Sequence, residues 1–269
     1  MIFAARSVIA VVFLVAAGGV MAPAAEADRV EARFEIFGFA GLHVLTDRMS
    51  IAEGANQYAI AVDLDTRGLA SVFVDLKSQS QVHGKLAGDT LRPEAYLADV
   101  RQNGVDRHYR LDYRGDDTVI NAATPTSGES PLLVAAAQVR GTVDQLTAYF
   151  LLERQLARRG TCALVVHVFD GSGLYDLRFT DIKRETLAAD SYQNFAGPTQ
   201  VCEVVRTDIA TDRNGDDNTY RRGKIWYARL IAEDRMIPIR MEFDTIFGAV
   251  TGYLAELRGH GFDFHLVRE

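Results

Sequence analysis

The sequence has no excess of basic residues and no metal-binding pattern, and each shortage excludes a class of function. Lys and Arg number 29 against 36 Asp and Glu, which gives a net charge of −7 at pH 7. A chain with this balance and no basic stripe is unsuited to binding nucleic acid. The six histidines are scattered and show no ligand spacing, so the sequence predicts no metal site.

Motifs for catalysis are also missing. Residues 170–173 read Asp-Gly-Ser-Gly, but a nucleophile elbow needs Gly-x-Ser-x-Gly between a strand and a helix, and we expect strands on both sides. Residues 212–218 resemble half of a calcium loop, yet Asp217 and Gly223 replace the required Gly and Glu. Turns account for both segments, with a weak calcium site and a hidden hydrolase site as the alternatives. We therefore expect a non-enzymatic protein without a cofactor.

The first 27 residues have the pattern of a secretory signal peptide. Arg6 precedes an apolar stretch at residues 8–20, and small residues follow at Ala25 and Ala27. The apolar stretch is shorter than the roughly 20 residues of a membrane span, and no later segment is apolar enough to form one. We therefore expect a periplasmic protein whose mature part, residues 28–269, is a single β-rich domain without a transmembrane segment.

Cysteine is scarce, with Cys162 and Cys202 as the two copies in the chain. In an exported protein an even pair of cysteines indicates a disulfide, because the compartment is oxidising. Two free buried thiols are the alternative. A metal site is not indicated, since no histidine lies near either cysteine at a ligand spacing.

The sequence is rich in alternation of apolar and polar residues, which is most regular at residues 224–267. Ile237, Ile239, Met241 and Phe243 alternate with polar neighbours, as they do on a pleated strand. Four such strands joined by short turns predict an antiparallel meander. The whole chain yields roughly a dozen strands, a number at which a sheet tends to curl or close. The expected fold is mainly β: a large antiparallel, curled sheet or an incompletely closed β-barrel.

One segment, residues 142–159, has the spacing of an amphipathic helix. Thr142 and Gln145 have the separation of a capping box, and Gly160 is a natural C-terminal stop. We expect this main helix to pack its apolar face on the sheet. Asn103-Gly104 predicts a tight hairpin. Residues 115–131 are rich in Gly, Pro and Ser and predict a long loop.

Several short motifs resemble an exported bacterial family of unknown function, the domain-of-unknown-function family 3108. They are residues 34–41, Tyr58 with residues 66–68, residues 144–148, residues 168–171 with 174–177, and residues 238–242 with 247–248. The resemblance extends over most of the chain after residue 27. It implies a β-rich protein of the periplasm or outer envelope and supplies neither an activity nor a ligand. A looser similarity to the open barrels of periplasmic lipoprotein carriers is a fold-level analogy.

Aromatic residues recur along the predicted strands. In a closed core they would serve packing alone, whereas in a half-open barrel some would line an apolar cavity. The candidates for such a lining are Phe34, Tyr58, Phe73, Trp226, Phe243 and Phe247. We expect a cell-envelope protein that binds a lipid or another apolar small molecule. The alternatives are an interaction module that binds an envelope protein through an edge strand or the 115–131 loop, and a cryptic hydrolase.

Overall fold

The structure, a computed structural model, describes most of the chain after the predicted signal peptide. The described residues are 28–38, 41–66, 75–88, 90–115, 119–121, 134–211, 221–231, 235–245 and 248–267. The signal-like residues 1–27 and the calcium-loop-like residues 212–218 lie outside these ranges. Within them, no helix has the length and apolar character that crossing a membrane would require.

The described residues form fourteen strands and one α-helix. Seven strands precede the helix: β1 (Asp28–Phe37), β2 (His43–Glu53), β3 (Gln57–Thr66), β4 (Leu76–Ala87), β5 (Thr90–Gln102), β6 (Val105–Tyr113) and β7 (Val119–Asn121). The helix is α1 (Gln145–Arg159). Seven strands follow it: β8 (Leu164–Phe169), β9 (Gly173–Leu187), β10 (Gly197–Thr211), β11 (Arg222–Ala228), β12 (Ile237–Thr245), β13 (Gly248–Gly259) and β14 (Phe262–His265).

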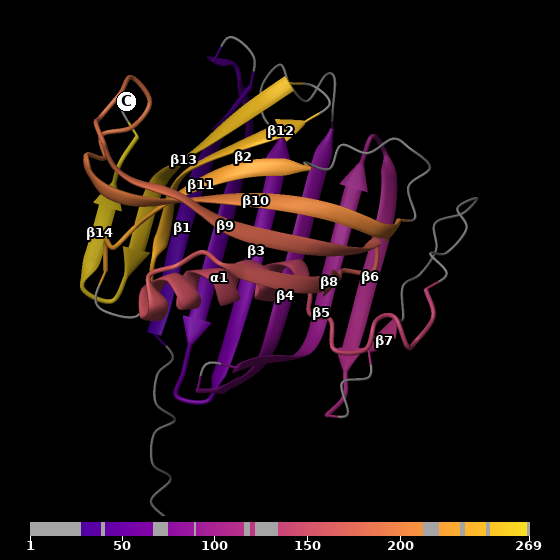
Figure 1. Cartoon of the computed structure of the whole chain (residues 1–269). Coiled ribbons are helices and arrows are strands. Elements are labelled where there is room, and N and C mark those ends of the chain that lie inside the picture. Colours follow the sequence, from indigo (N-terminus) through magenta and orange to yellow (C-terminus); the bar gives the residue numbers. More distant parts are fainter. Residues whose placement is uncertain are drawn as a thin grey trace, which may run out of the picture.

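All fourteen strands belong to one antiparallel sheet that curls without closing. Its order is β7-β6-β5-β4-β3-β2-β1-β13-β12-β11-β10-β9-β8, with β14 paired to β13. Strand β1 joins the two halves, because it pairs with β2 on one side and β13 on the other. In Figure 1 strands β2–β6 form one wall, and β9–β12 cross in front of it. The predicted fold class is confirmed, as is the closing meander, which consists of β11 to β14.

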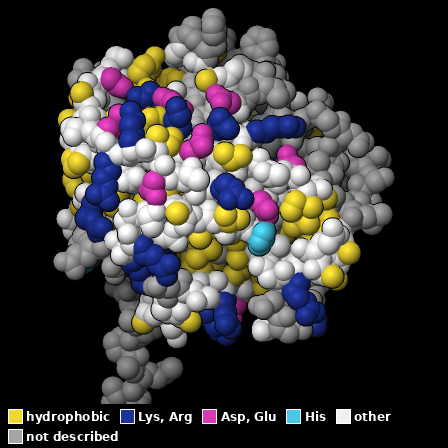
Figure 2. Space-filling model, in the orientation of Figure 1, with side chains coloured by type: hydrophobic (Ala, Val, Ile, Leu, Met, Phe, Trp, Pro, Cys, Tyr) yellow, Lys and Arg dark blue, Asp and Glu magenta, His cyan; other side chains and the backbone are white. Residues whose placement is uncertain are grey.

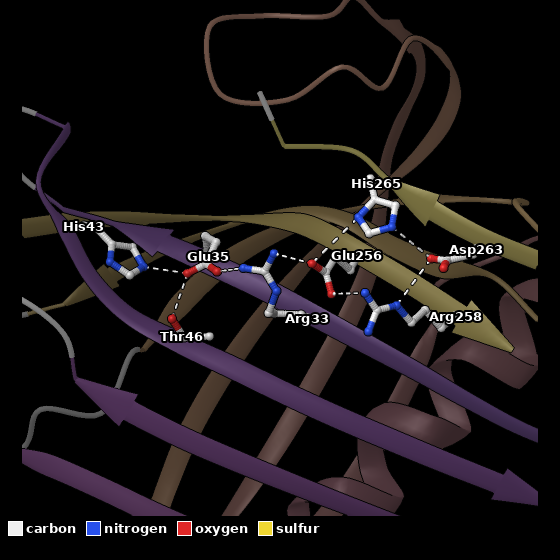
Figure 3. A network of polar contacts seen from close by, with 8 residues as sticks. All are labelled: Arg33, Glu35, His43, Thr46, Glu256, Arg258, Asp263 and His265. Carbon is white, nitrogen blue, oxygen red and sulfur yellow. Dashed lines mark hydrogen bonds and ion pairs between the residues drawn. The ribbon is translucent and has the colours of Figure 1, made fainter. Parts of the chain in front are cut away.

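The strands divide their side chains between an apolar inner face and a polar outer face. On β1, Phe34 and Ile36 are buried inside, whereas Arg33 and Glu35 lie on the outer side (Figure 3). There, Arg33 donates to Glu256 on β13 at 2.7 Å and also pairs with Glu35. The contact with Arg33 lowers the pKa of Glu256. The polar network in Figure 3 thus links β2, β1, β13 and β14 on the outside of the molecule.

Charged side chains cover the outer side of the second half as well. On the face shown in Figure 2, Lys and Arg side chains are interspersed with acidic ones across its upper part. The alternation of the strands therefore sends charge outward and apolar residues inward, as a period of two requires.

Helix α1 begins three residues later than the sequence predicted. Asp144 is the N-cap, and one carboxylate oxygen accepts from the Thr147 backbone N–H at 2.9 Å. The predicted cap, Thr142, instead donates its hydroxyl to the carbonyl of Val139 at 2.7 Å. Residue 143 still forms a parallel bridge with Val168 of β8, so the helix cannot start before that bridge ends. The predicted stop is confirmed, since Gly160 has the left-handed φ of 66°.

A disulfide joins Cys162 to Cys202 and fixes the C-terminal end of α1 to β10. Both cysteines are fully buried. They belong to the core cluster in which Ala148, Leu152 and Leu156 of the helix pack against β8–β11. The bridge therefore holds the helix against the second half of the sheet.

The two predicted connections differ in outcome. The Asn103-Gly104 hairpin is confirmed, and both residues have positive φ, 51° and 80°, as a type I′ turn requires. The predicted loop at residues 115–131 contains a strand, because β7 pairs with β6 within it, and residues 116–118 and 122–131 lie outside the described residues. Three residues were too few for an alternation pattern to indicate a strand.

Candidate ligand-binding cavity

The curled sheet forms a half-open cavity of about 500 Å³ between its two halves and helix α1. One wall comes from the inner faces of β1 to β6, and the opposite wall from β11 to β13. Its lining is mostly apolar and includes Phe34, Ile36, Met49, Val62, Leu64, Val100, Ile225, Met241 and Phe243. The volume lies in the range of small-molecule sites, roughly 300–1,000 Å³.

Small residues at neighbouring positions keep the interior hollow. On the first wall, Ser80 of β4 lies opposite Ala98 of β5, and Ser78 lies one inward position further along β4. On the second wall, Gly252 of β13 pairs with Met241, and the side chains of Met241 and Ile36 occupy the space beside it. The small side chains of Ser78, Ser80 and Ala98 on the first wall fill less volume than large apolar residues would at these lining positions. Because interiors pack densely wherever side chains can fill them, these three residues contribute to the cavity.

Helix α1 presents different faces to the cavity and to the core. Leu146, Tyr149, Phe150 and Glu153 line the cavity. Their spacing of i, i+3, i+4 and i+7 places them on one side of the helix. Ala148, Leu152 and Leu156, which pack against β8–β11, lie on another side of the helix. The helix therefore contacts the cavity with one side and the neighbouring core with the other.

Two carboxyl groups face this apolar interior with an oxygen that has no hydrogen-bond partner. Asp47 lies on the inner face of β2, between Phe34 of β1 and Leu64 of β3 in the register. Its Oδ1 has no partner among the described residues, and burial raises the pKa of Asp47 from 3.8 to about 7. Glu153 of α1 is 4% exposed, and its Oε2 has no partner in the same part of the chain. Burial raises its pKa to about 8, although Arg235 opposes the rise.

A buried ion-pair cluster lies behind Glu153. Arg235 donates to Glu53 at 3.0 Å, and Arg154 pairs with the other oxygen of the same carboxylate. Both guanidinium groups also lie over the ring of Phe150, at 5.5 and 5.7 Å from its centroid. Neither arginine belongs to the described cavity lining. Arg154 therefore ties the helix to β2, and the charge of Arg235 acts on the neighbouring Glu153.

The Asp-Gly-Ser-Gly segment at the cavity edge is a turn. The carboxylate of Asp170 accepts from the backbone N–H and the hydroxyl of Ser172 at 2.9 and 2.8 Å, and from the hydroxyl of Tyr175 at 2.9 Å. Ser172 thus donates to a carboxylate, whereas a nucleophile would donate to a histidine. The described residues include three His–Asp pairs, His108 with Asp99, His167 with Asp176 and His265 with Asp263, and all three are exposed on other strands. In the described ranges no group of acidic, His or Cys side chains could hold a metal.

The aromatic candidates from the sequence lie in different places. Phe34 and Phe243 are on the cavity wall. Tyr58 is in the packed core under the helix, where its hydroxyl is 2.9 Å from that of Thr147 and its ring contacts Phe150. Trp226 is on the opposite face of β11 from the lining residue Ile225, and its indole N–H donates to Glu185. Phe73 and Phe247 lie outside the described residues.

Sequence reasoning missed Asp47 and Glu153. Both occupy positions where the periodic pattern calls for an apolar residue. Asp47 stands in the series Leu45, Met49 and Ile51, and Glu153 stands in the apolar stripe of the helix. A polar residue within an apolar face was the signal that could have identified them.

A family comparison matches residues 33–255 to the model described as "Protein of unknown function (DUF3108)". The chain belongs to the DUF3108 family. The resemblance inferred from the short motifs is therefore confirmed. Among curated proteins, no sequence matches the chain.

Two solved structures are similar in fold to this DUF3108 chain over most of its length. The chain is similar to the crystal structure of a β-barrel-like DUF1849 protein from Brucella abortus, with a TM-score of 0.50 and 12% identity. The match covers 88% of this chain and 100% of that one. A structure from Parabacteroides distasonis, named "a putative lipoprotein", matches 88% of this chain and 97% of its own with 14% identity and a TM-score of 0.31. The first likeness supports the β-barrel-like fold alone.

Proposed function

We propose that this protein is an exported, non-catalytic protein of the cell envelope that holds an apolar molecule in the cavity. The observation that carries the proposal is the half-open apolar space of about 500 Å³ between two walls of one sheet and α1. Binding sites for small molecules are typically concave, largely preformed and lined by apolar side chains with a few polar groups. This cavity has that composition.

The place in the envelope rests on two features of the chain. Residues 1–27 carry the pattern of a signal peptide. The disulfide between Cys162 and Cys202 suits an oxidising compartment such as the periplasm, because cytosolic thiols are kept reduced. Both features support export, and fractionation of cells expressing the full chain would test it.

Binding of a partner protein through a sheet edge is the less favoured alternative. Strand β7 pairs with residues 111–113 of β6, so residues 105–110 of β6 have no described strand beside them on that side. This stretch carries Asp106, Arg107, His108 and Arg110, and charged side chains on an edge strand disfavour pairing with another strand. The other edge, β8, is partly occupied by the bridge between Val143 and Val168. The cavity, by contrast, offers a ligand extensive apolar contact.

Native mass spectrometry and solvent extraction of the purified protein test the proposal. We expect a bound apolar molecule to be released on extraction and to account for an added mass in the native spectrum. The variant Val62→Phe adds volume to the cavity wall, so the bound mass should fall by at least fivefold. Its control is Ala59→Phe, on the exposed face of the same strand.

Two results would contradict ligand holding. One is a protein purified from the periplasm that carries no extractable molecule and takes up no apolar fluorescent probe. The other is an equal loss of bound mass in Val62→Phe and Ala59→Phe, which would locate the ligand away from the cavity. Circular dichroism of both variants checks that the sheet is formed.

A further inference from the structure

The charged side chains of the cavity wall are all acidic among the described residues. Asp47, Glu153 and Asp170 belong to the lining, and no Lys, Arg or His does. Asp170 already accepts four hydrogen bonds within its own turn. Asp47 and Glu153 each keep one buried oxygen without a donor. The cavity therefore offers hydrogen-bond acceptors that its own chain does not satisfy.

We infer that the cavity selects an apolar molecule whose polar group is an uncharged hydrogen-bond donor, such as a hydroxyl, and rejects one that ends in a carboxylate. This inference rests on the proposed function and adds the class of ligand to it.

Asp47 gives the first reason. Its cross-strand neighbours on the inner face are Phe34 and Leu64, and neither can donate a hydrogen bond. The cation that acts on Asp47, Arg48, is the next residue on β2 and therefore points to the outer face. A buried acceptor without a donor destabilises the native state, because the hydrogen bonds it makes with water in the unfolded chain are not replaced. A hydroxyl carried by a ligand would supply the missing donor and remove that cost.

Glu153 gives the second reason and places a second acceptor along the same cavity. Arg235 lies close enough to lower its pKa, and this guanidinium donates to Glu53 through Nε and Nη2, while its buried Nη1 has no described partner. Arg235 does not belong to the cavity lining, whereas Glu153 does. Glu153 therefore adds a second unsatisfied carboxyl oxygen to the lining, on the helix and not on the sheet.

Charge explains the rejection of carboxylates. At pH 8, above its pKa of about 7, Asp47 is mostly ionised. An anionic head in this interior would then approach a carboxylate with no lining cation to offset it, and such repulsion is strong where the effective dielectric is low. The two arginines behind Glu153 lie outside the lining, and both pair with Glu53. An uncharged donor meets no such penalty.

Displacement of the neutral fluorescent probe N-phenyl-1-naphthylamine from the purified protein tests the inference. The competitors are 1-monooleoylglycerol and oleate, which share one acyl chain and differ in the head group, both below their aggregation concentrations at pH 8. We expect half-displacement by monooleoylglycerol at a concentration at least tenfold lower than by oleate. In the variant Asp47→Asn, the ratio of the half-displacement concentration of oleate to that of monooleoylglycerol should fall at least threefold. The reason is that oleate competes better once the acidic side chain is gone.

Asp244→Asn is the matched control, since Asp244 is exposed on the outer face of β12 and the substitution makes the same change of charge. Failure of the probe to bind would overturn the proposed function and this inference together. Probe binding with equal or better competition by oleate would leave the cavity in place and overturn the selection of an uncharged donor. An equal effect of Asp47→Asn and Asp244→Asn would also overturn it. Glu153→Gln, measured in the same way, should lower the same concentration ratio by a smaller factor, because a carboxyl with a pKa of about 8 is only partly ionised at pH 8.

Discussion

Replacing Asp47 by Asn should make the protein more stable at alkaline pH, because the native state holds this carboxyl in an apolar cavity. Burial raises its pKa from 3.8 to about 7, with Asp63 adding to the rise and Arg48 opposing it. A group whose native pKa is raised contributes stability that is complete below the unfolded pKa and is lost as pH rises through the native pKa. The wild-type protein therefore loses stability between about pH 4 and pH 7 through this residue.

The magnitude follows from linkage. With pKa values of 3.8 unfolded and about 7 native, the free energy of unfolding contributed by Asp47 falls by about 2.5 kcal/mol between pH 5 and pH 8. Asn does not titrate, and the cost of burying its amide is the same at both pH values and cancels. For a domain of this size, about 2.5 kcal/mol corresponds to roughly 5–10 °C in melting temperature.

The assay is thermal unfolding followed by circular dichroism at pH 5 and pH 8. We expect the melting temperature of Asp47→Asn minus that of wild type to be roughly 5–10 °C higher at pH 8 than at pH 5. Asp244→Asn, at an exposed position on the outer face of β12, should show little dependence on pH relative to wild type. The reasoning is refuted if the two variants change with pH in the same way.

The disulfide and the helix cap give two more predictions. Replacing Cys162 and Cys202 by Ser should lower the free energy of unfolding by about 4 kcal/mol, since the bridge spans 40 residues; equal urea midpoints for the oxidised and reduced protein would show that it adds no stability. Asp144→Ala should cost about 1–2 kcal/mol in the same assay, because it removes the cap of α1. Thr142→Ala should cost less, as its hydroxyl makes a single bond to Val139; an equal or larger loss would argue for the cap predicted from sequence.

The sequence alone was sufficient for local structure. Alternation along residues 224–267 identified a meander, and Asn103-Gly104 identified a hairpin, because both signals depend on neighbours within a few residues. The cysteine pair was predicted from compartment chemistry. Helix α1 was found with its C-terminal stop but with the wrong cap, since the bridge between Val143 and Val168 is a contact between separate segments.

The pairing of β1 with β13 and the position of the cavity were decided by the tertiary structure. Strands β1 and β13 are more than two hundred residues apart, and the alternation within each strand does not indicate its partner. Their pairing nevertheless joins both halves of the sheet. Trp226 and Phe243 look alike as aromatic residues of neighbouring strands, but one faces outward and one lines the cavity. A period of two tells which residues share a face, whereas only the curl of the sheet decides which face becomes the inside.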